Sequence, residues 1–558
     1  MPDHNNAMEQ DTKNLNKDLL LKIPKEVSHV TNTLEKAGFE AYLVGGCVRD
    51  LLMSQILSEV EGGKIPQDWD ITTNARPEQI IGLFEKTVYE NTFGTVVVVV
   101  PRETLEGDVS HVTQNMIIEV TPYRTEAKYS DFRHPDEVKF SDKLEDDLKR
   151  RDFTVNAMAL RTSSAEGGSA SGGKGHLVDL FDGIKDIQDK TLKAVGNPDD
   201  RFAEDALRML RAVRFSCQLN FFIAQETMES ILKNSELIKQ ISFERIRDEF
   251  VKIIMSENSA SGIVMLQKFN LLKNIISELL EGIGCEQGGE HIYDVWDHLL
   301  HALQHAADKN WPLEIRLAAL FHDIGKPKAR RSIAEMKNNS SALLHPSGGT
   351  FRQQNFSSSP HTKKKFTFYG HEVVGARMTK KIMERLKFSK KEIELVEKLV
   401  RNHMFFSDTE LITLGAVRRI ITKVGVENIW LLMNVRECDR VGMKKKETPY
   451  RLRKYFAMIE EALRDPISVG QLKINGEFMI KELGIYPGPR MGWILHALLE
   501  EVLDAPEKNT VEHLSELVKS LNMLGDAELK TLGLRGKEKK EELEEEEVKK
   551  LHTKHNVE

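Results

Sequence analysis

Short apolar runs set the pattern of the first third of the chain. Residues 41–44, 95–100 and 116–121 are rich in valine, isoleucine and other apolar side chains, which predicts three β-strands. The first run ends at Gly45 and Gly46, and the helix-like segment VRDLLM follows, so we expect a strand–turn–helix unit there. This part of the chain is therefore predicted to form a small mixed sheet with helices beside it.

From about residue 199 the pattern becomes helical. Apolar residues recur at three- and four-residue spacing, as in RFAEDALRMLRAVRF, and this continues to about residue 505. Two polar stretches interrupt the chain. The Gly/Ser-rich residues 161–175 predict a loop inserted into a β-hairpin, and residues 330–365, rich in Ser, Asn, Lys and Arg, predict a disordered loop. Residues 537–558 are a charged run that predicts a solvated helix or a frayed tail.

These patterns predict an α+β fold, in which a small mixed-sheet head precedes an all-helical remainder. With 558 residues, the chain is too long for one compact domain. In chain order we expect a head at 25–195, a helical neck and body at 196–288, a histidine-rich helical domain at 289–445, a helical tail at 446–510 and a charged extension at 511–558.

Composition and charge exclude some classes of protein. Hydrophobic residues make up 40% of the chain, and no apolar stretch approaches the roughly 20 residues that span a bilayer, so we expect no membrane partner. Residues 1–18 are polar, unlike a secretory signal, and the four cysteines form no CxxC pair, so we expect a cytoplasmic protein. The net charge of −7 does not indicate a nucleic-acid binder, although a local basic surface can still bind phosphates.

The segment QDWDITT carries the first candidate site. On a strand, Asp68 and Asp70 lie on one face while Trp69 and Ile71 point to the core. Two neighbouring carboxylates repel each other unless a cation lies between them, and Mg²⁺ shared with substrate phosphates suits them. Such a pair alone is weak evidence, because a surface turn or a helix cap gives the same pattern.

The upstream segment LVGGCVRDLLM strengthens the metal interpretation. Gly45 and Gly46 begin a helix, and free backbone N–H groups at a helix N-terminus can bind a triphosphate. Arg49 lies one helical turn further along and adds positive charge to that anion site.

With these motifs the sequence resembles the tRNA nucleotidyltransferase and poly(A) polymerase family, of the class shared by bacteria and eukaryotes. The resemblance extends from about residue 25 to 285. The matching segments, in the family's order, are LVGGCVRDLL, DWDITTNARPEQI, FGTVVVVV, IEVTPYR, DLKRRDFTVNAMAL, LVDLFDGIKDI, NPDDRFAEDALRMLRAVRF and ISFERIRDEF.

The resemblance implies a catalytic Mg²⁺ site at Asp68 and Asp70, and roles for Arg151 and Asp152 in triphosphate and ribose recognition. Arg150 is a weaker candidate for the same anion surface, and Asn156 has either a binding or a structural role. Glu119 is a candidate third acidic residue near the metals. The residues implied to bind nucleotide are Gly45, Gly46, Arg49, Arg151, Asp152, Asp205, Arg208, Arg211 and Arg214.

The family pattern also implies how the base is selected. Helical spacing along RFAEDALRMLRAVRF places Asp205, Arg208 and Arg211 on one face of a helix. Cytosine and adenine both offer an amino donor beside a ring-nitrogen acceptor, which Asp205 and Arg208 can match, whereas uracil and guanine reverse this pattern. Arg211 and Arg214 are candidates for phosphate binding. The alternative is an amphipathic helix with a basic solvent face.

Two further segments resemble parts of this family. Residues 126–139 resemble its mobile loop, and SFERIRDEF resembles a neck motif in which we expect Glu244 and Arg245 to be structural. Residues 472–499 resemble the tail that follows an HD domain, where Lys473 and Arg490 can contact tRNA backbone.

Histidines and aspartates recur after residue 290, most clearly in LFHDIGKP, and their order resembles that of the HD phosphohydrolase domain. The resemblance implies four ligands of one metal ion, with two more histidines for a second ion. Imidazole with carboxylate favours a transition metal: Ni²⁺, Mn²⁺, Co²⁺, Fe or Zn²⁺. The implied four are His298, His322, Asp323 and Asp439, and the two further ligands are His371 and His403.

The sequence thus predicts an enzyme that adds CCA to the 3′ end of tRNA from CTP and ATP, releasing pyrophosphate, with an HD domain that can act as a phosphohydrolase. One alternative is a poly(A) polymerase, or an enzyme that adds only A or only C. An alternative of another class is an HD phosphohydrolase whose head only docks RNA.

Overall fold

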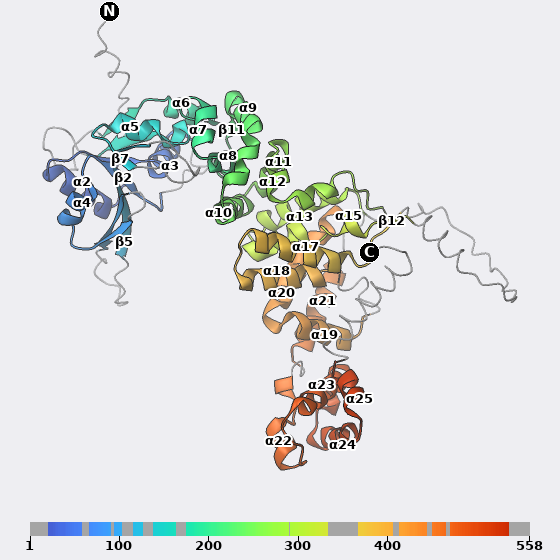
Figure 1. Cartoon of the computed structure of the whole chain (residues 1–558). Helices are drawn as coiled ribbons and strands as arrows, with labels where there is room; N and C mark the ends of the chain where they lie inside the picture. Colours follow the sequence, from blue (N-terminus) through green and yellow to red (C-terminus); the bar gives the residue numbers. More distant parts are fainter. Residues whose placement is uncertain are drawn as a thin grey trace, which may run out of the picture. The chain divides into compact units, whose positions relative to one another are not determined.

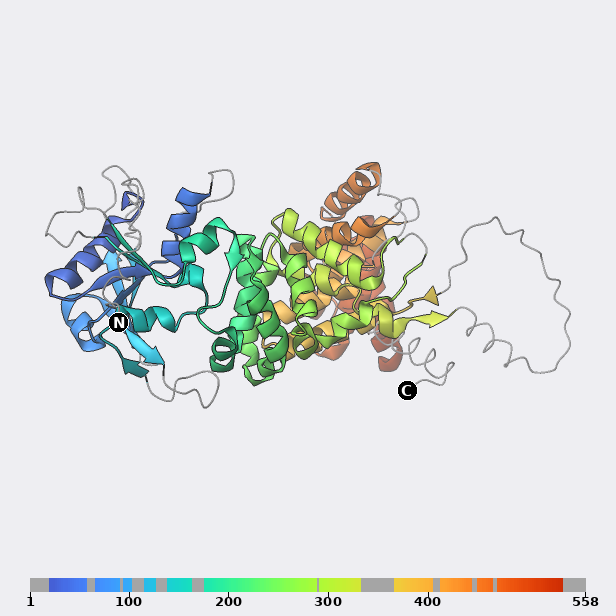
Figure 2. The same cartoon turned by 90° about the horizontal axis from the view of Figure 1, so that it is seen from above.

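The computed structural model describes residues 20–57, 66–90, 94–102, 115–126, 138–162, 175–288, 291–332, 366–404, 412–443, 449–464 and 469–534. The chain divides into two units, Met1–Ile275 and Ile276–Glu558, and each is described by itself. Figures 1 and 2 show their elements from two sides.

The first unit begins with a seven-stranded mixed sheet in the order β3-β4-β5-β2-β1-β8-β9. Neighbouring strands are antiparallel, except that β2 and β5 are parallel. The three strands predicted from apolar runs are confirmed as β1, β4 and β5. The strand bounds are β1 Ala41–Val44, β2 Asp70–Thr73, β3 Thr87–Glu90, β4 Thr95–Pro101, β5 Asn115–Pro122, β8 Met158–Arg161 and β9 His176–Asp179.

Helices cover this sheet. Helices α2 and α4 pack on each other and on sheet strands, and α3 packs on β1 and β8. Helix α2 buries Val27, Val30 and Leu34, which recur at helical spacing. The bounds are α2 Lys25–Lys36, α3 Gly46–Ile56, α4 Pro77–Leu83, α5 Leu144–Lys149, η3 Thr154–Asn156 and α6 Gly183–Gln188, with a small hairpin of β6 Arg124–Glu126 and β7 Val138–Phe140.

The rest of the first unit is helical, apart from the short parallel pair β10 Thr191–Leu192 and β11 Phe222–Ile223. Helix α8 packs against α10 and α11. The bounds are α7 Pro198–Glu204, α8 Leu207–Leu219, α9 Gln225–Asn234, η4 Ser235–Gln240, α10 Phe243–Ile254, α11 Ser259–Lys268 and α12 Leu272–Ile275. A mixed-sheet head followed by helices confirms the predicted α+β class.

The prediction of one continuous helix along RFAEDALRMLRAVRF is wrong. Helix α7 ends at Glu204 and α8 begins at Leu207, with Asp205 between them in an extended conformation (φ −143°, ψ 102°). The Asp205 Oδ1 atom accepts a hydrogen bond from the Leu207 backbone N–H at 3.0 Å. A short carboxylate side chain that bonds the backbone two residues on competes with helical hydrogen bonding, which explains the break.

The described part of the second unit is helical except for the short antiparallel pair β12 Arg331–Ser332 and β13 Phe366–Thr367. The bounds up to residue 464 are η5 Ser277–Gly282, α13 Val295–Asp308, α14 Leu313–Phe321, α15 Lys326–Ala329, α17 His371–Arg385, α18 Lys390–Asn402, α19 Leu414–Val424, η6 Val426–Asn428, α20 Ile429–Asp439, η7 Arg440–Gly442 and α21 Pro449–Ala462. Helix α14 packs against α13, α18 and α20, so three helices meet around it.

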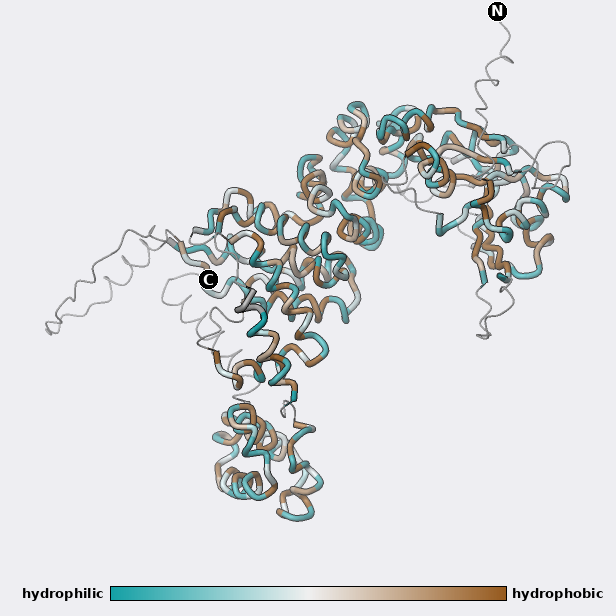
Figure 3. The backbone as a smooth tube through the Cα atoms, turned by 180° about the vertical axis from the view of Figure 1, so that it is seen from behind, coloured by the Kyte–Doolittle hydropathy of each residue, from teal (hydrophilic) through white to brown (hydrophobic). Residues whose placement is uncertain are grey.

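The last described helices pack around α23. The bounds are η8 Val469–Gln471, α22 Gly476–Lys481, α23 Pro489–Asp504, η9 Pro506–Lys508, α24 Val511–Asn522 and α25 Asp526–Leu534. The boundary predicted at residue 510 therefore falls between η9 and α24. Brown apolar and teal polar positions alternate along these helices, as an amphipathic pattern requires (Figure 3). No helix in the described residues is long and apolar enough to span a membrane.

The predicted hairpin around residues 161–175 is confirmed at its base, because β8 and β9 pair antiparallel. In this register Met158 lies opposite Asp179 and Arg161 lies opposite His176. The rest of that insertion, and most of the segments 330–365 and 126–139, lie outside the described residues, as does the charged run from 537.

Gly325, in the loop before α15, gives a test of packing in the second unit. A Cβ there lies 2.2 Å from the His371 carbonyl oxygen and 2.5 Å from the Gly375 backbone nitrogen. Backbone atoms cannot move aside cheaply, so we expect Gly325→Ala to lower the free energy of unfolding by about 1–3 kcal/mol. Gly492→Ala in α23 is the control, because a Cβ there meets nothing within 4 Å. Thermal unfolding of both variants measures the effect, and equal melting temperatures would contradict the expectation.

Candidate functional sites

The first site is built where strand β2 begins. Asp70 is the first residue of β2, whereas Asp68 lies just before the strand and is exposed. Trp69 and Ile71 are buried in the core, so the predicted alternation of side chains holds. Burial raises the pKa of Asp70 and the Asp68 charge adds to this effect, while Arg151 opposes it. The two carboxylates therefore lie close enough to interact, as a shared cation site requires.

Glu119 lies beside this pair. It is on β5, in register with Asp70 on the parallel strand β2, and residues in register project from the same face of a sheet. Glu119 is exposed, and its backbone N–H donates to the Trp69 carbonyl at 3.2 Å. A third carboxylate thus shares the face that carries Asp70.

Gly45 connects β1 to α3 with φ +79°, a conformation that favours glycine. A Cβ at this position lies 3.1 Å from Arg151 Nη1 and 3.6 Å from Asp70 Oδ2. The absence of a side chain therefore lets a guanidinium and a carboxylate approach the first turn of α3. Arg49 is less available than its spacing suggests, because Nη1 donates to Asn156 Oδ1 at 2.7 Å and Nε donates to Asp50.

One buried carboxylate, that of Asp147, holds two arginines of this site. Arg150 Nε and Arg151 Nη2 donate to the two oxygens of Asp147 at 2.8 and 3.0 Å. Burial acts to raise the pKa of Asp147, but the two guanidiniums outweigh it and the pKa is lowered. Arg151 is thereby fixed beside Gly45 and Asp70.

Asp152 is held by donors on several sides. Arg211 Nε donates to Asp152 Oδ2 at 2.7 Å, and the Phe153 N–H and Asn156 Nδ2 donate to Oδ1 at 2.8 and 3.3 Å. Burial acts to raise the pKa of Asp152, yet Arg211 lowers it to about 2. Asn156 thus joins Arg49 to Asp152 inside the site.

Arg214 occupies a different environment from Arg211. It is buried and pairs with buried Glu249 at 2.9 Å, and burial lowers its pKa to about 10. The guanidinium groups of Arg49, Arg211 and Arg214 all lie within 5.4 Å of the Phe215 ring centroid. Arg214 therefore resembles a core ion pair more than an exposed phosphate ligand, which spacing along the helix did not indicate.

Asp205 and Arg208 bind different partners. Arg245 of α10 donates to both oxygens of Asp205, whereas Arg208 Nη1 donates to Glu204 Oε2 at 2.8 Å and Nη2 to the Arg150 carbonyl at 2.9 Å. Both residues lie at the break between α7 and α8. Sequence reasoning missed the contact of Arg245 and described that residue only as structural.

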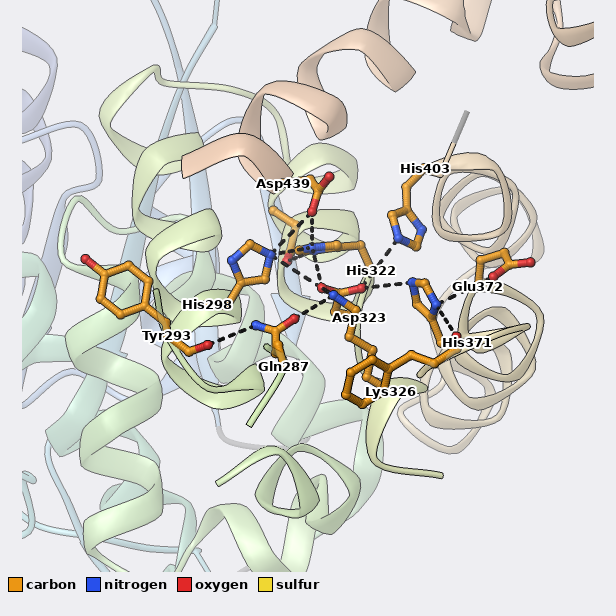
Figure 4. Close-up of polar contacts among 12 residues, drawn as sticks. Gln287, Tyr293, His298, His322, Asp323, Lys326, His371, Glu372, His403 and Asp439 are labelled. Atoms are coloured by element: carbon orange, nitrogen blue, oxygen red, sulfur yellow. Dashed lines mark hydrogen bonds and ion pairs between the residues drawn. The ribbon is translucent and has the colours of Figure 1, made fainter. Parts of the chain in front are cut away.

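The second site lies inside the second unit, where five helices bring together a histidine–aspartate cluster (Figure 4). His298 comes from α13, His322 and Asp323 follow α14, and Asp439 ends α20. One ligand atom of each lies within 4.8 Å of the others. His298 Nε2 is 3.1 Å from His322 Nε2 and 3.4 Å from oxygens of both aspartates.

A second set shares Asp323. His371, the first residue of α17, and His403, which follows α18, place their Nε2 atoms 3.2 and 3.5 Å from Asp323 Oδ1. The other oxygen, Oδ2, faces His298 and His322 at 3.4 and 3.3 Å. Asp323 therefore lies between two ligand sets, as a bridging carboxylate does. The structure thus brings together all six residues that the sequence assigned to this site.

Backbone carbonyls orient three of the histidines. The Nδ1 atoms of His322, His371 and His403 lie 2.7–2.9 Å from the carbonyl oxygens three residues earlier. Such a bond places the proton on Nδ1 and leaves the Nε2 lone pair for a metal. The Nε2 atoms of His371 and His403 are buried with no hydrogen-bond partner in the described part of the chain. The donor set therefore fits one or two metal ions.

Charge concentrates at this cluster. Lys326 Nζ lies 2.5 Å from Asp323 Oδ2 and donates to Gln287 Oε1 at 2.6 Å. Burial opposes ionisation of Asp323, but Lys326 and His322 lower its pKa overall. Burial also acts to lower the pKa of His322, and the two aspartates raise it to about 10, so a metal ion bound at Nε2 would take the place of the second imidazole proton. Sequence reasoning missed Lys326 and Gln287, although the lysine is part of LFHDIGKP.

Three further side chains of the second unit have partners of their own. His301 stacks on Tyr293 at 4.2 Å between ring centroids, and His305 Nε2 lies 3.0 Å from Glu437. Arg490 in α23 pairs with Asp526 and donates to the Asn522 and Leu524 carbonyls. Its guanidinium therefore connects α23 to the end of α24 and the start of α25.

Family profiles match four segments of the chain. Residues 41–193 match the poly A polymerase head domain, and residues 220–282 match "Probable RNA and SrmB- binding site of polymerase A". Residues 289–444 match the HD domain, and residues 373–518 match a profile of tRNA nucleotidyltransferase domain 2. Thus Gly45, Asp70, Arg151 and the histidine–aspartate cluster fall within matched segments, whereas residues 205–214 lie between the first two segments.

Curated relatives and solved structures are similar to this chain. The CCA-adding enzyme of Lactobacillus delbrueckii subsp. bulgaricus is 45% identical over 231 residues, 41% of this chain and 50% of the relative. That of Enterococcus faecalis is 42% identical over 240 residues, 43% of this chain and 51% of the relative. These matches span about half the relatives' length. The crystal structure of Bacillus stearothermophilus CCA-adding enzyme with CTP is 24% identical with a TM-score of 0.58, covers 89% of this chain and 97% of that chain, and establishes a shared fold.

The head site and the histidine–aspartate cluster define a nucleotidyltransferase head joined to an HD domain in one chain. The chain thus contains a poly A polymerase head domain followed by an HD domain, and residues 373–518 match a tRNA nucleotidyltransferase domain.

Proposed function

We propose that this protein is a cytoplasmic CCA-adding tRNA nucleotidyltransferase, which transfers two C residues and one A from CTP and ATP to the 3′ end of tRNA and releases pyrophosphate. The observation that carries the proposal is the head site, where Asp70 and Arg151 flank Gly45 at the start of α3. Relatives named CCA-adding enzymes are 45% and 42% identical to the chain over 231 and 240 residues. The five-part division predicted from the sequence is proposed with it.

In the head site, Asp68 and Asp70 would hold Mg²⁺, with Glu119 as a third acid on the same face. The ions supply charge compensation for the attacking 3′-hydroxyl and the departing pyrophosphate. The N–H groups of Gly45 and Gly46 at the start of α3 bind the triphosphate, and fixed Arg151 adds a charged donor. Asp152, held by Arg211, accepts from the ribose.

Base selection falls to Asp205 and Arg208. Asp205 accepts from the amino group of cytosine or adenine while Arg208 donates to the adjacent ring nitrogen. Arg208 donates to Glu204 in the structure, so reading a base requires Arg208 to share or leave that bond. UTP and GTP would leave two buried groups mispaired, which is costlier than losing one favourable contact.

For the second unit we propose a metal-dependent phosphohydrolase. His298, His322, Asp323 and Asp439 would hold one ion, and Asp323, His371 and His403 a second, from Ni²⁺, Mn²⁺, Co²⁺, Fe or Zn²⁺. Such ions polarise a phosphoryl oxygen and activate water. The substrates that fit are phosphomonoesters or 2′,3′-cyclic phosphates at RNA 3′ ends, whose removal restores the hydroxyl that the head site needs.

The decisive experiment offers tRNA lacking its CCA end, with Mg²⁺ and each nucleotide alone and in pairs. We expect CTP alone to add two residues, CTP with ATP to complete CCA, and UTP and GTP to be ignored. A long A-only tail would support the poly(A) polymerase alternative. Addition of only C or only A to the matching tRNA end would indicate a partial enzyme. No addition by protein that hydrolyses phosphoesters would favour a phosphohydrolase with an RNA-docking head.

A further inference from the structure

Arg245 of α10 is the side chain that fixes the orientation of Asp205. Its Nη2 donates to Asp205 Oδ2 at 2.7 Å and its Nη1 to Oδ1 at 3.3 Å. The Leu207 backbone N–H also donates to Oδ1, at 3.0 Å. Because Asp205 lies between α7 and α8 rather than within a helix, these three donors set the direction of its carboxylate.

The donors use the two oxygens unequally. Each carboxylate oxygen has two lone pairs in the carboxylate plane. Oδ1 accepts from both Leu207 and Arg245, whereas Oδ2 accepts from Arg245 alone. Among these contacts one acceptor position is left, and it is on Oδ2. A single lone pair of fixed direction is what one amino hydrogen of cytosine or adenine needs.

We propose that Arg245 is a positioning residue for base selection, which presents Asp205 Oδ2 to the amino group of the incoming nucleotide. This inference rests on the proposed function, because it takes Asp205 as a base reader. A carboxylate that can rotate would turn away from the carbonyl oxygen of uracil or guanine and tolerate it. A carboxylate held by a two-pronged guanidinium keeps its lone pair against that carbonyl, so repulsion rejects the wrong base.

The setting of the pair fits this role. The side chains of Arg245 and Asp205 are 25% and 17% exposed, so the carboxylate is shielded yet open to a ligand. Arg245 itself follows Ser242 and Glu244 at the start of α10, whose apolar residues Ile246, Phe250 and Ile253 are buried. Helix α10 therefore anchors the Arg245 guanidinium. Asp205 Oδ2 is thus held in place by a helix other than α7 and α8.

The test compares Arg245→Ala and Arg245→Lys with Arg247→Ala. Arg247 lies two residues along α10, is half-buried like Arg245 and pairs with Asp248, so it is a matched control. The turnover number and KM are measured for all four nucleotides on tRNA lacking CCA and on tRNA ending in CC. For Arg245→Ala we expect the preference for CTP over UTP, and for ATP over GTP, to fall by about tenfold or more. For Arg245→Lys we expect a smaller fall in this preference than for Arg245→Ala, because one ammonium group cannot hold both carboxylate oxygens of Asp205.

Two further measurements distinguish a positioning role of Arg245 from a merely structural one. Melting temperatures of Arg245→Ala and Arg247→Ala show whether the fold has changed. If Arg245 acts through Asp205, adding Arg245→Ala to Asp205→Ala changes selectivity no further. Unchanged selectivity with uniformly slower addition, or fully additive losses in the double variant, would overturn the inference.

Failure of the proposed function gives a different result. Wild-type protein that adds no nucleotide to tRNA would overturn the CCA assignment, and the equilibrium dissociation constants of the four nucleotides would then test Arg245 alone. Weaker discrimination in binding by Arg245→Ala than by wild type supports the positioning role. Equal discrimination by both proteins contradicts it.

Discussion

We expect nucleotide addition to fall by about 10³-fold or more in Asp70→Ala, because several kcal/mol of metal stabilisation would be lost and each 1.4 kcal/mol is about a factor of ten. Asp70 lies 3.6 Å from the position of a Gly45 Cβ, beside the expected triphosphate, and shares its face with Glu119. The loss should appear in turnover rather than in tRNA affinity, because on the proposed function scattered phosphate contacts would hold tRNA. Single-turnover incorporation of CTP and a filter-binding assay measure the two quantities.

Asp142→Ala is the matched control for this prediction, since Asp142 is an exposed carboxylate of the same unit and pairs with Arg76. Asp70→Asn removes the charge with almost no change in shape. Turnover near that of wild type in either Asp70 variant would place the metal site elsewhere in the head.

The second large effect concerns the histidine–aspartate cluster. Asp323→Asn removes the carboxylate that faces both ligand sets, so we expect metal affinity to fall by more than the about 10–100-fold typical of outer-sphere changes. Because Asp323→Asn would bind less metal, we expect it to lose phosphoester hydrolysis even when Ni²⁺, Mn²⁺ or Co²⁺ is supplied. CCA addition should remain, because the head site draws its residues from the other unit.

Elemental analysis and hydrolysis of a model phosphoester measure this effect. Asp297→Asn is the control, since it is the same chemical change at an exposed position one residue before His298. If Asp323→Asn does not fold, His371→Gln tests one ligand set alone and should lower metal content without removing it. Metal content in both variants equal to that of wild type would make the cluster a structural core.

The sequence predicted those parts of the molecule whose signals are local. The β-branched runs predicted strands β1, β4 and β5 within one residue at each end, because strand formation depends on an apolar pattern that is visible locally. The convergence of six histidines and aspartates in the second unit was also predicted, because LFHDIGKP and its spaced partners were recognised as a set. Motif order carried more information than the chemistry of any single residue.

Long-range pairing explains what could not be predicted. Arg49 bonds Asn156 and Arg214 bonds Glu249, residues 107 and 35 positions away, so their side chains are less available to phosphate than their spacing indicated. The break at Asp205 was missed because the apolar repeat continues on both sides of it. What holds Asp205 is a contact with Arg245, 40 residues later, which no local pattern reveals.

The paired strands β8 and β9 have a consequence for how this chain tolerates change. Their register brings Arg161 directly opposite His176, so the segment between them starts and finishes at adjacent points of the sheet. Varying its length alters only the entropy of closing a loop, which grows slowly, by about 0.6 kcal/mol for each doubling. This position is therefore a natural attachment point, where a fluorescent peptide or an affinity tag can be grafted without disturbing the strands on either side.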